Sequence, residues 1–81
     1  MKFKLYANVA LNEDIPKSVF KKGDIGTLID IFEPNQNTIE NGYAIEMFNA
    51  LGDSLDALVL RESQIHPISE DSVMNERLLE V

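Results

Sequence analysis

The sequence has no cysteine, no tryptophan and only one histidine among its 81 residues. Without cysteine, the chain can form no disulfide bond, no thiolate zinc site and no thiol nucleophile. It also has no apolar run of membrane-spanning length, and its first residues alternate between charged and apolar side chains, unlike the continuous apolar segment of a signal peptide. These absences predict a cytoplasmic protein that has no membrane partner and depends on side-chain packing for its stability.

Few residues in the chain suit catalysis or metal binding. His66 is the single imidazole, and without a second histidine or a cysteine it is a poor start for a metal site or a catalytic triad. The Gly23–Gly26 segment lacks the third glycine and the following helix of a phosphate-binding loop. Three carboxylate pairs fall in predicted exposed turns, where both members stay solvated: Glu13 with Asp14, Asp53 with Asp56, and Glu70 with Asp71. We therefore expect no catalytic residue, no metal and no cofactor.

Positive charge is also scarce. Fourteen acidic residues against seven basic ones give a formal net charge of −7, which on average repels nucleic acid and attracts a basic protein partner. A simpler alternative is that the acidity only maintains solubility. The aromatic residues lie in apolar strand contexts, which favours a core role over base stacking or a groove for proline-rich peptides.

Most of the chain has an apolar period of two, which predicts strands over residues 3–11, 25–32, 43–48, 55–60 and 63–68. Pro16 interrupts the ladder after the first strand, and the segment Lys21-Lys22-Gly23-Asp24 supplies a turn in which glycine can take a positive φ. Either Gly23 or Gly26 is expected to adopt a backbone conformation that a Cβ would disfavour. The 33–42 segment is polar and is predicted to be a hairpin loop. Ile29, Ile45 and Val59 are expected to be buried. This pattern predicts an all-β fold, a small five-stranded SH3-like barrel over residues 1–68.

The last thirteen residues change character. Ser69 can cap a helix, Glu70 and Asp71 suit its first turn, and apolar residues recur at a spacing of four. The spacing predicts a short C-terminal helix over residues 69–81. Three turns of helix are marginal in isolation, so the apolar stripe must dock on its own barrel or on another chain.

A series of short motifs stands in order along the chain: Val9-Ala10-Leu11 with Asp14-Ile15-Pro16, Lys22-Gly23-Asp24-Ile25-Gly26-Thr27-Leu28, Tyr43-Ala44-Ile45-Glu46-Met47, Gly52, and Ala57 to Leu60. Together they resemble a widespread bacterial family of SH3-like domains of unknown function. The resemblance runs from Leu5 to Pro67 and leaves the tail outside. Met47 stands where the family more often has phenylalanine, and Leu55 where it has threonine or serine. The family is more distantly similar to the barrel of nitrile hydratase β subunits, and its members look like small partners of larger proteins.

Two functions remain open from the sequence. The first is a non-catalytic protein-binding module, such as an antitoxin or immunity-like partner of a neighbouring gene product, acting as a monomer or weak homodimer. The second, implied by the resemblance, is an accessory subunit or small-ligand regulator of a nitrile-hydratase-like enzyme. For the first, we expect a partner-facing surface of exposed carboxylates and apolar tail residues: Glu13, Asp14, Glu33, Glu46, Asp53, Asp56, Val73, Met74 and Leu78.

Overall fold

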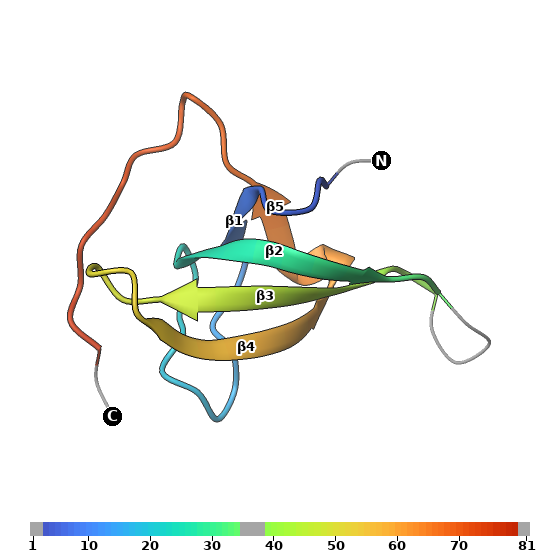
Figure 1. Ribbon diagram of the computed structural model, residues 1–81, viewed down its shortest axis with the longest axis horizontal. Helices are drawn as coiled ribbons and strands as arrows, with labels where there is room; N and C mark the ends of the chain where they lie inside the picture. Colours follow the sequence, from blue (N-terminus) through green and yellow to red (C-terminus); the bar gives the residue numbers. More distant parts are fainter. Residues whose placement is uncertain (1–2, 35–38, 80–81) are drawn as a thin grey trace.

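The computed structural model describes residues 3–34 and 39–79. Within them, five strands form one antiparallel sheet in the order β4-β3-β2-β1-β5 (Figure 1). The strands are β1 (Asn8–Leu11), β2 (Ile25–Phe32), β3 (Gly42–Phe48), β4 (Ser54–Arg61) and β5 (Ile65–Pro67). A short 3-10 turn, η1 (Glu62–Gln64), links β4 to β5, which returns to pair with β1. The all-β prediction is confirmed.

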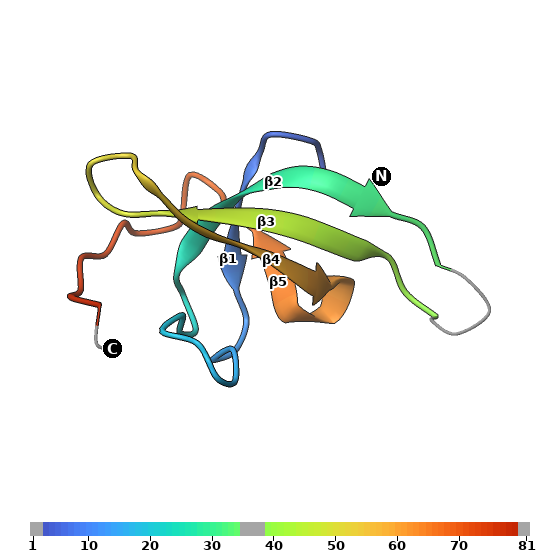
Figure 2. The same cartoon turned by 60° about the horizontal axis from the view of Figure 1, so that its bottom comes forward.

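The sheet is open, so the predicted five-stranded SH3-like barrel is not closed. In the part of the chain that the structure describes, β4 and β5 are the two edges of the sheet and do not pair with each other. β5 has three residues and ends at Pro67, which has no N–H to donate. It therefore extends the sheet beside β1 without reaching β4. The sheet is strongly curved, as the two views in Figures 1 and 2 show.

The first strand is shorter than the sequence predicts. Tyr6 has a φ of 67°, and Ala7 N–H donates to the Lys4 carbonyl (3.2 Å), so the chain turns before β1 begins at Asn8. Leu5 shares the period-two apolar pattern of Val9 and Leu11 in the sequence but lies before the strand and is 48% exposed. Phe3 is buried from outside the strand, and its ring meets that of Tyr43 edge to face at 5.0 Å.

A β-bulge in β2 changes which of its residues face the core. Ile45 and Ala44 are consecutive on β3, but their partners on β2, Leu28 and Asp30, are two residues apart. Ile29 is therefore the extra residue of the bulge. Leu28 is fully buried, whereas Ile29 is half-buried, so the prediction that Ile29 belongs to the core is wrong.

The inward face of β4 was also assigned wrongly. Leu60 lies opposite Tyr43 and is buried, and Leu58 lies opposite Ile45 and packs against the core. Val59 points to the other face and is 71% exposed. Ile45 is fully buried, as predicted.

Tyr43 is the largest fully buried side chain, and its hydroxyl is satisfied on both sides. It donates to Glu62 Oε1 and accepts from Asn41 Nδ2, both at 3.1 Å. Burial raises the pKa of this phenol, and the Glu62 carboxylate raises it further against the opposing effect of Asn41. These bonds connect the core to η1 and to the start of β3.

The tail is not helical, so the prediction of a helix over residues 69–81 is wrong for the described residues 69–79. Ser69 does begin one turn: its carbonyl accepts from Ser72 N–H (3.0 Å) and its hydroxyl accepts from Asp71 N–H (3.2 Å). The turn does not propagate. After it the chain runs extended past the β3–β4 turn (Figures 1 and 2). Bonds from Arg77 to the β1–β2 loop take the place of the helical bonds that so short a segment could form only weakly.

Candidate functional site

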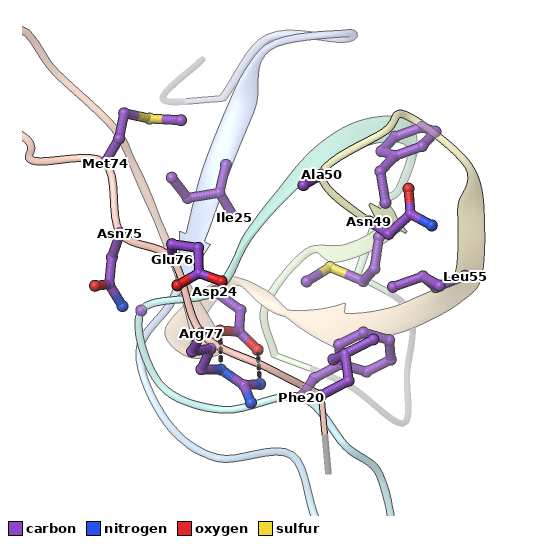
Figure 3. Close-up of a pocket in the computed structure, with 14 residues that line it drawn as sticks. Phe20, Asp24, Ile25, Asn49, Ala50, Leu55, Met74, Asn75, Glu76 and Arg77 are labelled. Atoms are coloured by element: carbon purple, nitrogen blue, oxygen red, sulfur yellow. Dashed lines mark hydrogen bonds and ion pairs between the residues drawn. The ribbon is translucent and has the colours of Figure 1, made fainter. Parts of the chain in front are cut away.

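A groove of about 460 Å³ lies where the tail passes the end of the sheet. Its lining comes from four parts of the chain: the β1–β2 loop, the strand ends of β2 to β4, the β3–β4 turn and the tail (Figure 3). The lining residues are Phe20, Gly23, Asp24, Ile25, Met47, Phe48, Asn49, Ala50, Leu55, Met74, Asn75, Glu76, Arg77 and Leu79. Phe20 and Met47 are buried, whereas Phe48 and Leu55 are each 39% exposed. The groove therefore has an apolar floor that remains partly open to solvent.

An arginine–carboxylate pair forms part of the lining of this groove. Arg77 Nε donates to Asp24 Oδ1 at 2.9 Å, and Arg77 Nη2 donates to Asp24 Oδ2 at 2.5 Å (Figure 3). Nη2 also donates to the Val19 carbonyl at 2.8 Å. Two parallel bonds from one guanidinium to one carboxylate are the geometry for which arginine is suited and lysine is not.

The Asp24 carboxylate is held in place from its own loop. Lys21 N–H donates to Asp24 Oδ2 (2.8 Å), and Asp24 N–H donates to the Lys21 carbonyl (3.0 Å). Gly23, in the same turn, has a φ of +90°, as the sequence predicts. Burial raises the pKa of Asp24, but the hydrogen bonds from Arg77 and the Lys21 backbone, with the charges of both residues, outweigh it and leave the pKa below 3.8. The carboxylate is therefore ionised at neutral pH.

The opposite wall is the β3–β4 turn, which Asn49 organises. Its Oδ1 accepts from Leu51 N–H (3.0 Å) and from Asp53 N–H (2.9 Å). Its Nδ2 donates to Asp53 Oδ2 (3.1 Å). Gly52 completes the turn with a φ of +88°. The wall is thus fixed by local bonds that do not depend on the tail.

The predicted acidic surface is divided between different parts of the molecule. Glu33 follows β2 at one end of β3, whereas Asp53 lies in the turn at the other end. Glu46, on β3, accepts a bond from Ser54 Oγ (2.8 Å), which ties it to the β3–β4 turn side. The structure therefore brings Glu46 and Asp53 to the groove end of the sheet and leaves Glu33 apart.

The remaining predicted carboxylates are exposed. Glu13 and Asp14 lie in the β1–β2 loop, where Asp14 Oδ1 accepts from Lys22 N–H (2.9 Å) and so helps to shape the loop. Asp56 is on the edge strand β4, opposite Met47. Of these three, Asp14 has a structural bond to the loop that carries Asp24.

The predicted apolar stripe does not form, because its helix is absent. Val73, Met74 and Leu78 are 88%, 78% and 80% exposed, and of the three, Met74 lines the groove. Sequence reasoning missed Arg77 and Asp24, which connect the tail to the sheet. Arg77 is one of two arginines in the chain and the only basic residue of an acidic tail. This isolated positive charge was the feature of the sequence that could have identified it as a functional residue.

The groove offers groups for recognition. Among the described residues, its lining includes no imidazole, hydroxyl or thiol, and the ionisable groups are Asp24, Glu76 and Arg77. Across residues 3–34 and 39–79, no cluster of three or more histidine and carboxylate side chains is placed to hold a metal ion. The same ranges contain no helix long and apolar enough to cross a membrane.

Comparison with known proteins gives a family. No curated protein and no solved structure matches the chain. A family model does match, over residues 5–67, which spans all five strands and leaves the tail outside. The chain therefore belongs to the family described as a domain of unknown function, DUF4926.

Proposed function

We propose that this protein is a non-catalytic protein-binding module whose partner presents a basic surface. One observation carries the proposal: the groove at the end of the sheet holds an extended peptide segment by a bidentate arginine–carboxylate pair over an apolar floor. A carboxylate held ionised beside apolar side chains is a recognition site for a positively charged chain.

The charge of the whole chain supports the same partner. With a net charge of −7, the protein attracts basic surfaces at long range. Exposed carboxylates add to this field, such as Glu13 in the loop that carries Asp24 and Asp56 opposite Met47 on the edge strand. Such charges accelerate association more than they strengthen the final complex. An antitoxin or immunity-like protein, which covers the basic surface of a neighbouring gene product, fits this description.

The proposal also includes a fold type, an origin and a cellular location. The strand order and the 3-10 turn before the last strand favour an SH3-like arrangement. A bacterial origin and a distant relation to nitrile hydratase β subunits rest on the motif resemblance, and a cytoplasmic location rests on the lack of cysteine. If the partner proves to be a metalloenzyme subunit, the accessory-subunit function replaces the one proposed.

The test is capture of the partner by the full-length protein, followed by measurement of the on-rate. Between about 10 mM and 150 mM salt the Debye length falls from ~30 Å to ~8 Å, so we expect the on-rate to decrease over this range. Glu13→Lys and Asp56→Lys should lower it further. Glu33→Lys is the matched control, because Glu33 lies away from the groove end. An on-rate that ignores salt and both reversals would show that the acidity serves solubility only.

A further inference from the structure

The tail is attached to the groove mainly through one side chain. Among the described residues 69–79, Arg77 is the half-buried one, and the others are exposed. Even Leu79 and Met74, which line the groove, are 42% and 78% exposed. A segment that buries so little apolar surface gains little from the hydrophobic effect, so its docking depends on the guanidinium.

We propose that this groove is a binding site for an extended, arginine-bearing segment of another protein, and that the tail is a resident competitor that occupies the site until such a segment displaces it. The proposal rests on the proposed function, which it deepens by naming the ligand chemistry. The tail itself shows that chemistry: an arginine, with an apolar side chain three residues before it and another two residues after it.

The site is specific for a guanidinium. Asp24 offers two oxygens to one planar donor group, and the Val19 carbonyl takes a further N–H of the same group. A lysine ammonium, which is a point charge, cannot form the parallel pair of bonds. The Lys21 backbone bond to Asp24 and the Asn49 bonds in the opposite wall belong to the loops of the sheet, so these two parts of the site keep their shape without the tail.

The tail is suited to leave the site without unfolding the sheet. The buried apolar core lies between Phe3 and Ile65, and none of its residues comes from the described part of the tail, residues 69–79. The Arg77 side chain is 30% exposed, so solvent and a competing guanidinium can both reach the pair. Only molecules in which the tail has left the groove can bind a ligand there. The apparent affinity of the ligand therefore decreases as the fraction of molecules with a docked tail increases.

The test uses the full-length protein and a synthetic peptide. The probe is the blocked, fluorescein-labelled peptide of residues 72–79, and its matched control has lysine in place of arginine. We expect the probe to bind Arg77→Ala protein about tenfold more tightly than wild type, because loss of one charge-assisted bond shifts docking by at least this factor. We expect the lysine peptide to bind about tenfold more weakly than the arginine peptide, and Asp24→Asn protein to lose binding of both.

Amide spectra locate the peptide and verify the fold of each variant. Binding should shift the amide signals of Phe20, Asp24 and Asn49, and Arg77→Lys serves as a second tail-release variant if Arg77→Ala is unstable. Any one of three results would overturn the proposal. The probe could bind wild type and both release variants with equal affinity, the two peptides could bind with equal affinity, or the shifted amide signals could lie away from the groove. A partner whose binding the peptide does not inhibit would reject this site and keep the proposed function. If the peptide binds but no protein partner with a salt-dependent on-rate is found, the binding site is kept and the proposed function is rejected.

Discussion

Gly26 gives the sharpest test of the packing described above. It lies in β2 between Val9 of β1 and Met47 of β3, and it is buried. A Cβ at this position would lie 2.5 Å from Ile45 Cγ2, 2.5 Å from Met47 Sδ and 3.0 Å from the Glu46 carbonyl oxygen. The methionine can move aside, but the buried isoleucine and the backbone of β3 cannot do so without repacking the sheet.

The expected cost of Gly26→Ala follows from this crowding. Forcing extra volume into a packed core costs about 1–3 kcal/mol, from which the better strand propensity of alanine removes about 0.5–1 kcal/mol. We expect a net loss of up to about 2.5 kcal/mol in the free energy of unfolding, a large share of the stability of a small domain. Urea titration monitored by circular dichroism measures it as a lower midpoint at constant slope.

Gly42→Ala is the matched control, because Gly42 also lies in a central strand but has room. The nearest atom to a Cβ there is Phe32 Cβ at 3.6 Å, an ordinary contact. This variant should be neutral or more stable by up to about 1 kcal/mol. If Gly26→Ala loses no more stability than Gly42→Ala, the close packing of β2 against β3 is refuted.

Three further outcomes are expected. Ile45→Ala should reduce the free energy of unfolding by about 2–5 kcal/mol and Val59→Ala by less than about 0.5 kcal/mol, because Ile45 is fully buried and Val59 is 71% exposed. Similar losses for the two variants in urea titrations would contradict the assigned faces. Gly23→Ala should cost about 1–2 kcal/mol and Gly23→Asn less, since asparagine tolerates a positive φ; equal costs in thermal melts would argue against the strained turn. The lowered pKa of Asp24 stabilises the folded protein above pH 3.8, and this contribution disappears as pH falls through the lowered value. In wild type, the NMR signal of Arg77 Nε should therefore report release of the tail in that acid range, whereas Asp24→Asn should show the released signal at every pH.

The local parts of the fold could be read from the sequence because they depend on neighbouring residues. Strand existence followed from the period of two, and the turn at Gly23 followed from the need for a positive φ. Inward faces were assigned correctly where the strand is regular, as at Ile45. At Ile29 the same reasoning failed, since a bulge adds one residue and exchanges the two faces, and no local pattern marks where the partner strand will skip.

The sequence by itself therefore determined an acidic, all-β chain with its strands in nearly the right places and its carboxylates largely at the surface. Only the tertiary structure decided that the sheet stays open, that the tail is extended, and that Asp24 binds Arg77. The contact between Asp24 and Arg77 joins residues 53 apart in the chain, and its free energy depends on geometry that the whole sheet must first create. The helical spacing of the tail was real, but a helix of three turns is so marginal that one bidentate pair over an apolar groove outweighs it.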